Sequence, residues 1–404
     1  MSVLTPSTSI RSEVLLLYAA RGVRGFADGF AVIILPAYLS AIGLSPAEIG
    51  IVATAALLGS SLLTLTAGFM APRHDLRTML LLGAALMVAT GIAFPQVSHI
   101  AFVLVVAFVG TINPQAGDAG ILVPLEHAML ARSVADDDRT RAFARYSLTG
   151  ALATAAGSLM AATPDLLVAA GFGRLASFEA MFYAYAALGL LGAVLYRRLP
   201  HAQAEQKAST PLGPSRRTVY KLAALFSLDS FAGGLVVQSL LALWLFQRFD
   251  LSLSAASLFF FWTSVLTAFS YPIAARLAGR IGLVNTMVFT HIPSSIFLIL
   301  AAISPNLFLT LGLLLMRSAL AQMDVPARSS YVMAVVTPAE RTAAASVTAV
   351  PRSLASALGP ALAGMLLATP FSGLPLIACG VLKITYDLAL LYSFRHVKPP
   401  EERD

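Results

Sequence analysis

The feature that most constrains this chain is a succession of apolar stretches separated by short polar breaks. A helix needs about 20 mostly apolar residues to cross a hydrocarbon core roughly 30 Å thick, and the stretches are of this length. Hydrophobic residues make up 58% of the chain and charged residues only 12%, whereas soluble domains are about one quarter charged. We therefore predict an all-α membrane protein that crosses the bilayer many times.

Hydropathy divides the chain into twelve predicted transmembrane helices, six on each side of one long polar gap. The predicted helices cover residues 14–39, 48–71, 78–96, 100–131, 141–162, 177–196, 217–247, 253–277, 283–303, 306–336, 342–368 and 372–394. The gap is rich in Pro, Ser, Gln and charged residues, so it buries too little apolar surface to fold by itself. We predict an N-terminal six-helix bundle at 1–196, a cytoplasmic linker at 197–216 and a C-terminal six-helix bundle at 217–404.

The basic residues orient the chain in a membrane. The formal net charge is +7, but Lys and Arg lie mainly in the short breaks, as in proteins that obey the positive-inside rule. With a cytoplasmic amino terminus the inner loops collect most of them, while the outer loops hold Arg174 and Arg248. We expect an integral protein of the cytoplasmic (inner) membrane, with both termini cytoplasmic, in contact with the lipid bilayer and without a nucleic-acid partner.

Short sequence matches relate the two predicted bundles to each other. VADDDRTRAFA in the first half matches VTPAERTAAAS in the second, which aligns Arg139 with Arg341. DGFA from Asp28 matches DSFA from Asp229, and an LS pair follows in each half. All three offsets are close to half the chain length, which indicates an internal duplication. Repeats of this kind place the substrate path at the interface between the halves.

The loop after the second predicted helix carries Gly68, Arg73 and Arg77 at a spacing that is similar to that of the major facilitator superfamily. The family pattern after the second helix is Gly-x-x-x-Asp-Arg-x-Gly-Arg-Arg, and this chain has Gly68, Arg73 and Arg77 in register. Pro72 replaces the acidic residue and Asp75 replaces the second glycine. The resemblance covers essentially the whole chain, because YLSAIGLSPAEIG resembles the first outer loop and TPAERTAAASVTAVPRSLASALGPALAG resembles the tenth-to-eleventh loop and the eleventh helix.

The resemblance implies two pseudo-symmetric six-helix bundles that move a small-molecule substrate by alternating access. The glycines and the Gly-Pro pair of the eleventh helix also resemble a motif of drug and proton antiporters, which carry it in the fifth helix. We expect a monomer. The sequence offers no nucleophile-and-base pairing, no phosphate-binding glycine loop and no metal-ligand cluster, so neither enzymatic activity nor a cofactor is expected.

Charged residues within the apolar stretches concentrate on the first, fourth, seventh and tenth helices. A charge in the bilayer interior costs from ~3 to more than 10 kcal/mol, so such residues normally face a cavity. In the family, these four helices line the central cavity. On the first helix, Arg21, Arg24 and Asp28 share one face. We expect the two arginines to bind substrate and Asp28 to carry protons; the alternative is an Arg24–Asp28 pair that only neutralises itself.

The fourth helix holds two prolines and two glycines in its middle, which predicts a bent or broken helix. Asn113 and Gln115 are substrate-binding candidates. Asp118 and Glu126 are proton-coupling candidates, because an isolated buried carboxylate has a raised pKa. The alternative is that both carboxylates pair with Arg on a neighbouring helix and act as inter-helix clamps.

The seventh and tenth helices supply the remaining candidates. We expect Asp229 and Asp324 to take part in proton coupling and Gln238 to bind substrate. The alternative is that Asp229 lies close enough to the inner surface to be solvated. Arg317 is the candidate for holding an anionic group, since guanidinium binds carboxylate or phosphate in bidentate fashion. Asp324 and Arg328 have i, i+4 spacing and are able to pair with each other. The predicted gating residues are Arg73, Arg139, Arg328 and Arg341.

Four further ionisable residues lie in apolar stretches and are expected to be structural: His291, Arg352, Lys383 and Asp387. The leading hypothesis is a proton-coupled exporter of small organic molecules. A carrier for an organic or inorganic anion, bound by intramembrane arginines, is the alternative. A receptor or assembly factor that shares the fold without transporting is the hypothesis from another class.

Overall fold

The computed structural model describes residues 8–115, 120–134, 136–203, 212–337 and 340–394. Within these ranges the secondary structure is helical, with one isolated β-bridge between Asp75 and Gln203 and no strand. Eleven helical segments of the described chain are long and apolar enough to cross a membrane, and a shorter apolar helix covers Ile100–Val109. The predicted all-α membrane fold is confirmed, and its twelfth span corresponds to the interrupted fourth one.

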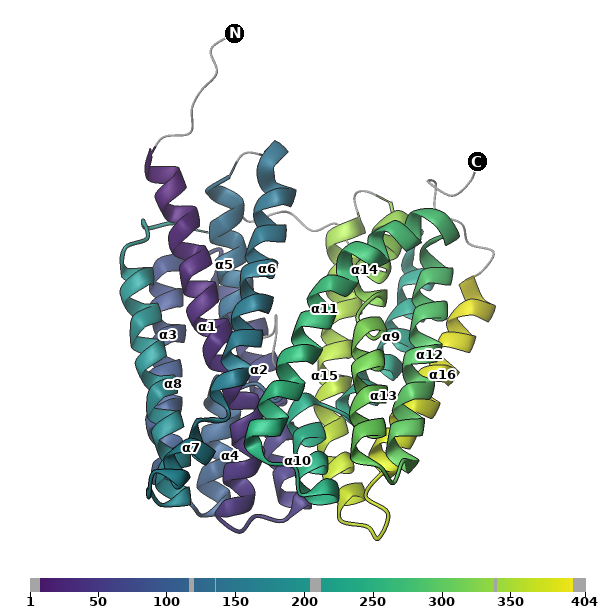
Figure 1. The fold of residues 1–404 in the computed structure, drawn as a ribbon. Coiled ribbons are helices and arrows are strands. Elements are labelled where there is room, and N and C mark those ends of the chain that lie inside the picture. The colour runs from purple at the N-terminus through teal and green to yellow at the C-terminus, as the bar shows by residue number, and fades with distance from the viewer. Residues whose placement is uncertain (1–7, 116–119, 135, 204–211, 338–339, 395–404) are drawn as a thin grey trace. The chain divides into compact units, whose positions relative to one another are not determined.

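The helices follow one another along the chain as shown in Figure 1. They are α1 (Thr8–Ala41), α2 (Pro46–Met70), α3 (Leu76–Ala93), the 3-10 helix η1 (Phe94–Gln96), α4 (Ile100–Val109), α5 (Leu122–Arg132), α6 (Asp136–Met160), α7 (Thr163–Ala169), α8 (Arg174–Arg197), α9 (Arg216–Gly234), α10 (Gln238–Phe249), α11 (Leu253–Ile281), α12 (Leu283–Ile303), α13 (Leu307–Leu320), α14 (Asp324–Ala334), α15 (Arg341–Leu367) and α16 (Leu374–Phe394).

Three predicted spans are each divided into two helices. The fourth span separates into α4 and α5, as its prolines and glycines predict. The seventh separates into α9 and α10 directly after Gly233 and Gly234, where glycine weakens the helix. The tenth separates into α13 and α14; here Pro326 lacks the amide hydrogen that would continue the backbone ladder. The tenth span itself lies where it was predicted, at Leu307–Ala334, but its break was not predicted.

The chain forms two compact units. Unit 1 comprises Met1–Leu44, Ala55–Gln206 and Ser252–Phe261, and unit 2 comprises Ser45–Thr54, Lys207–Leu251 and Trp262–Asp404. In unit 1, α1 packs against α6 and α8, and α3 packs against α8. In unit 2, α9 packs against α15 and α16, and α12 packs against α16. Corresponding helices of the two halves thus form the same pairs, which supports an internal duplication.

Glycines allow the closest of these helix pairs to form. A Cβ atom on Gly29 of α1 would collide with the carbonyl of Thr154 on α6, and one on Gly157 of α6 would collide with that of Phe26 on α1. In unit 2, a Cβ on Gly234 of α9 would collide with the carbonyl of Ser356 on α15. Small residues at such contacts let helix backbones approach within a membrane, where no hydrophobic force drives them together.

Two carboxylates outside the spans hold the ends of the polar gap. Asp75 caps α3 by accepting the Thr78 N–H at 3.0 Å, and its other oxygen accepts the Ala202 N–H at 2.7 Å. Burial raises the pKa of Asp75, but the hydrogen bonds from Thr78, Ala202 and His201 outweigh it and lower the pKa to about 2. The start of the predicted linker is therefore tied to the α2–α3 loop of unit 1.

Glu340 plays the corresponding part in unit 2. It accepts hydrogen bonds from the Thr337 hydroxyl at 2.6 Å, from the Ser215 hydroxyl at 2.7 Å and from the Gly213 N–H. These hydrogen bonds, that from Thr337 first, lower the pKa of Glu340 to about 2. The segment just before α9 is thereby tied to the α14–α15 loop.

Candidate functional site

Unit 1 contains a buried ion pair between α1 and α5. The Arg24 Nη2 donates to Glu126 Oε2 at 2.7 Å and to the Tyr146 hydroxyl at 3.1 Å. Glu126 also accepts from the hydroxyls of Tyr196, at 2.5 Å, and of Tyr146. Its side chain is fully buried, and both of its oxygens have donors. The geometry is that of the inter-helix clamp considered for Glu126 as the alternative to proton coupling.

Asp28 lies one turn further along α1 and is held much less firmly. Its Oδ2 is 3.8 Å from Arg24 Nη1, which is too long for a hydrogen bond. Within the described part of unit 1 this is the one ion pair that Asp28 makes, and the guanidinium concerned already bonds to Glu126. Asp28 also lines a recess together with Ser60, Thr111 and Tyr185. The Asp28 carboxylate thus faces the recess without a cation at hydrogen-bonding distance among the described residues.

Two other predicted substrate-binding residues of unit 1, Arg21 and Asn113, are buried and are not among the residues that line the recess. Arg21 is buried between α1 and α6, with its guanidinium 5.4 Å from the centre of the Tyr146 ring and packed over Gly150. Asn113 follows α4, is buried and accepts the backbone N–H of Gln115 at 2.9 Å. Asp118, predicted as a proton-coupling residue, lies outside the described residues. The recess is lined by described residues of α1, α2, α3, α5, α8 and the segment between α4 and α5.

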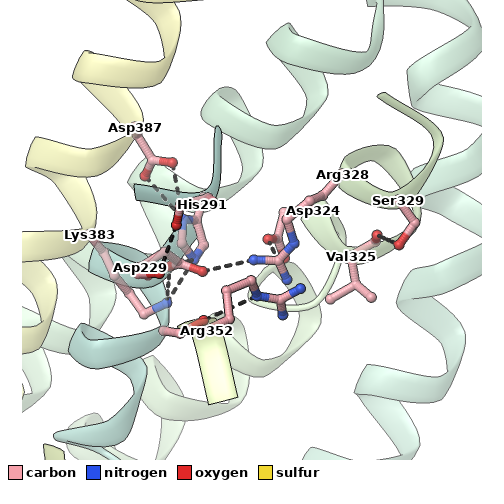
Figure 2. A network of polar contacts seen from close by, with 12 residues as sticks. Asp229, His291, Asp324, Val325, Arg328, Ser329, Arg352, Lys383 and Asp387 are labelled. Carbon is pink, nitrogen blue, oxygen red and sulfur yellow. Dashed lines mark hydrogen bonds and ion pairs between the residues drawn. The ribbon is translucent and has the colours of Figure 1, made fainter. Parts of the chain in front are cut away.

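Unit 2 holds a larger network of buried charges, drawn in Figure 2. Asp229 of α9 accepts Lys383 Nζ at 2.6 Å on one oxygen and Arg328 Nη1 at 2.9 Å on the other. Arg328 Nη2 also lies 3.3 Å from Asp324 Oδ2, the i, i+4 pair predicted from the sequence. Asp229 corresponds to Asp28 in the duplication, yet it is held by two cations at hydrogen-bonding distance.

A histidine extends this network to α12 and α16. The His291 Nδ1 lies 3.1 Å from each oxygen of Asp387, and its Nε2 lies 3.2 Å from Lys383 Nζ. An ammonium group can only donate, so Nε2 acts as the acceptor and Nδ1 carries the ring hydrogen that is donated to Asp387. The imidazole is therefore neutral in this arrangement.

The residues of this part of the network were expected only to be structural. The i, i+4 spacing of Lys383 and Asp387 within an otherwise apolar helix was the sequence feature that indicated a buried polar cluster. His291 alone gave no indication of its partners, because these lie 92 and 96 residues away. Arg352 of α15 joins the cluster by donating from Nε to the Ser230 hydroxyl at 3.2 Å.

Two more predicted binding residues of unit 2 take no part in the contacts described above. Arg317 of α13 is half-buried, and its guanidinium makes no hydrogen bond or ion pair with the described residues. Gln238 begins α10, and its side-chain nitrogen is buried without a hydrogen-bond partner in the described chain. Both remain predictions as substrate-binding residues.

The predicted gating arginines have local partners or are exposed. Arg139 Nη2 donates to the Ala131 carbonyl and Arg341 Nε donates to the Met333 carbonyl, each at 3.2 Å. Each arginine thus helps to cap the carboxyl end of the preceding helix, α5 or α14, in the same way in both halves. Arg73 is exposed after α2. Their roles as gates stay predictions.

Two duplicated helical units with charges buried at membrane depth are typical of a secondary transporter. The sequence matches the family profile described as Major Facilitator Superfamily over residues 17–246 and 222–404. The chain belongs to the major facilitator superfamily.

Similar proteins agree with this assignment. The uncharacterized membrane protein YJR124C of Saccharomyces cerevisiae is 24% identical over 95% of this chain and 94% of its own length. Among solved structures, the nucleoside transporter NupG aligns with a TM-score of 0.73 at 17% identity, covering 95% of this chain and 99% of its own. The xylose transporter XylE from E. coli aligns with a TM-score of 0.71 at 14% identity, covering 96% and 99%.

These structures share the fold with this chain. The family and its structural neighbours are transporters rather than enzymes, so the chain is an integral membrane protein that works as a secondary transporter of a small molecule by alternating access.

Proposed function

We propose that this transporter couples the movement of a small solute to protons, with Asp28 as the group that binds and releases the proton. The supporting observation is the difference between Asp28 and Asp229, which occupy corresponding positions in the two halves. Asp229 has two cations within 2.9 Å, whereas Asp28 has one at 3.8 Å and lines a recess. A proton carrier must be stable both charged and neutral.

The arrangement around Arg24 lets Asp28 change its charge at low cost. When Asp28 is protonated, Arg24 keeps its 2.7 Å bond to Glu126, so no buried charge loses its partner. Protonation of Glu126 or of Asp229 would instead leave an arginine or lysine uncompensated in a buried site, which is strongly unfavourable. Among the described carboxylates of these two clusters, Asp28 and Asp387 lack a firm cationic partner.

The moving bodies in this proposal are the predicted bundles at 1–196 and 217–404, joined by the linker at 197–216. Export of organic molecules and location in the cytoplasmic membrane stay predictions. Among the structural neighbours, NupG is a nucleoside transporter, XylE is a xylose transporter and a third is a peptide transporter. These classes, together with organic anions and amphipathic cations, form a reasonable first panel for a thermal-shift screen, since a bound ligand stabilises by mass action.

The test uses the compound that stabilises the purified protein in this screen. In proteoliposomes with an imposed pH gradient, we expect the wild-type protein to move that compound against its own gradient. Asp28→Asn should lose this accumulation while it continues to exchange labelled for unlabelled compound, because the amide cannot carry a proton. Asp138→Asn, which removes an exposed carboxylate, is the matched control and should behave as the wild type.

Two results would contradict the proposal. One is wild-type transport that ignores the pH gradient. The other is an Asp28→Asn variant that still couples to the gradient as the wild type does.

A further inference from the structure

The charges in the unit 2 network balance as a whole but are unevenly distributed along it. Three cations, Lys383, Arg328 and Arg352, accompany three carboxylates, Asp229, Asp324 and Asp387, while His291 is neutral. Lys383 and Arg328 are both bound to Asp229, and Arg328 also reaches Asp324. The middle of the network is therefore closely paired.

One cation and one carboxylate remain at opposite ends. Within the described ranges no carboxylate oxygen lies within 4.0 Å of the Arg352 guanidinium, which donates a hydrogen bond to the Ser230 hydroxyl. In the same part of the chain, no Lys or Arg nitrogen lies within 4.0 Å of the Asp387 carboxylate, which is bound by neutral His291. Figure 2 shows Asp387 above Asp229 and Arg352 below it.

The Arg352 end has the chemistry of an anion site. Its Nε is used by Ser230, which leaves the two terminal amino groups of the guanidinium for a bidentate acceptor. The side chain is partly exposed, whereas Asp387 is fully buried, so Arg352 is at the more accessible end of the network. The charge of Arg328 repels Arg352, and the attraction of Asp229 and Asp324 reaches it without an ion pair. A bound anion would relieve that repulsion.

The Asp387 end has the chemistry of a proton site. A proton added to His291 Nε2 or to Asp387 gives the network one net positive charge, which an anion at Arg352 would balance. The helices packed against α12 are α13, α14 and α16. Their ionisable groups are Arg317 on α13, Arg328 and Asp324 on α14, and Asp387, Lys383 and Tyr386 on α16, and Asp229 of α9 lies 3.8 Å from His291 Nε2. Of these, Asp387 is the carboxylate without a cation.

We propose that unit 2 binds a small anion, through a carboxylate or phosphate group, at Arg352, and that protonation of the His291–Asp387 pair strengthens this binding. The proposal rests on the assignment of the chain as a proton-coupled transporter and names an anionic substrate class for it. By linkage, the anion must favour protonation by the same factor as the proton favours the anion.

The test measures equilibrium binding to purified protein in lipid nanodiscs at constant sodium chloride concentration. The anionic probes are benzoate, acetate and inorganic phosphate, and benzamide is the neutral analogue of benzoate. We expect at least one anion to bind and benzamide not to bind. Arg352→Gln should weaken anion binding by about ten- to a hundredfold, as expected for loss of hydrogen bonds to a charged group. Arg352→Lys keeps the positive charge but not the two parallel N–H donors of the guanidinium, so it should lose less affinity for the anion than Arg352→Gln.

A second measurement addresses the proton. Wild-type affinity for the anion should increase as the pH falls from 8 to 6, by up to about tenfold for each unit over which one proton is taken up. Asp387→Asn removes the negative charge permanently, so it should bind the anion tightly with little dependence on pH. Arg174→Gln, outside both clusters, is the control for general effects of charge and should bind as the wild type.

The proposal is overturned if none of the three anions binds better than benzamide, if Arg352→Gln keeps wild-type affinity, or if Asp387→Asn keeps the wild-type pH dependence. Thermal unfolding of each variant separates misfolding from loss of binding. This experiment is separable from the one on Asp28, because it compares equilibrium binding by Arg352 and Asp387 variants that all retain Asp28. A failure of Asp28 as proton carrier would be seen in flux alone.

Discussion

Glu126 illustrates how a carboxylate can stay charged deep in a membrane protein. Arg24 compensates its charge, and the hydroxyls of Tyr146 and Tyr196 occupy its remaining acceptor sites. A buried ion pair contributes little beyond an apolar replacement, but the removal of one partner is costly because the other charge remains. At the scale of single residues, the pair therefore holds four helices of unit 1 in place.

Replacement of Glu126 by Gln should accordingly destabilise the protein. The change leaves Arg24 with Asp28 at 3.8 Å as its carboxylate, and we expect a loss of about 3–5 kcal/mol, the usual result of breaking a buried pair. Thermal unfolding of the purified variant measures it. Asp138→Asn affects an exposed pair with Arg141 and should change the unfolding temperature little. Equal unfolding temperatures for Glu126→Gln and the wild type would contradict the clamp.

At the scale of helices, the two halves use the same device to bring α1 to α6 and α9 to α15. Glycine removes the Cβ at the points where the backbones come closest, and carbonyl oxygens occupy the space. The duplication is thus visible in packing even where the side chains have diverged. The polar clusters depend on it, since Arg21 on α1 lies over Gly150 on α6, and Arg352 on α15 bonds to Ser230 on α9.

Gly157→Ala tests this packing. The added methyl group would meet the carbonyl of Phe26, which cannot rotate away as a side chain would, so the two helices must separate. We expect a loss of about 1–3 kcal/mol in stability, as for other overpacked contacts. Gly312→Ala in α13 is the control: nothing lies near its Cβ position, and alanine should raise stability by up to about 1 kcal/mol. Effects of the same sign at both sites would argue against the packing role.

At the scale of the whole molecule, the polar gap between the halves is tied to each unit by one carboxylate. The Asp75 bonds hold Ala202 and the Glu340 bonds hold Gly213. The family pattern after the second helix has glycine at the position of Asp75. Glycine has no side chain and could make neither of the contacts that Asp75 makes. The carboxylate caps α3 and binds the beginning of the gap at the same time.

These two anchors should weaken in acid. Both carboxyl groups have a pKa of about 2 when folded, below their ordinary values of 3.8 for Asp75 and 4.5 for Glu340. Their contribution to stability is therefore complete above the unfolded values and is lost as the pH falls through about 2. Hydrogen exchange at Ala202 and Gly213, corrected for the intrinsic effect of pH, should show protection at pH 6 that decreases between pH 4 and pH 2. Asp75→Asn should remove this dependence at Ala202 and keep it at Gly213.

The spans, the duplication and the helices that carry charge can all be inferred from the order of the amino acids. Hydropathy is a local property, and lipid requires every span to satisfy its own backbone, so apolar stretches of this length must become helices. The same penalty on charge selected Asp28, Glu126, Asp229 and Arg328 as special residues before any contact was known. The break in the fourth span also followed from local composition, through its prolines and glycines.

Which of these charges are paired depends on how the helices pack against one another. Asp28 and Asp229 occupy matching positions in nearly identical tetrapeptides, yet one is held loosely and the other by two cations. That difference comes from Lys383 on α16 and Arg328 on α14, about 154 and 99 residues away. Electrostatic interactions act through a few ångströms of space, so helix neighbours, which no local pattern specifies, determine whether a buried carboxylate is a fixed clamp or is free to take a proton.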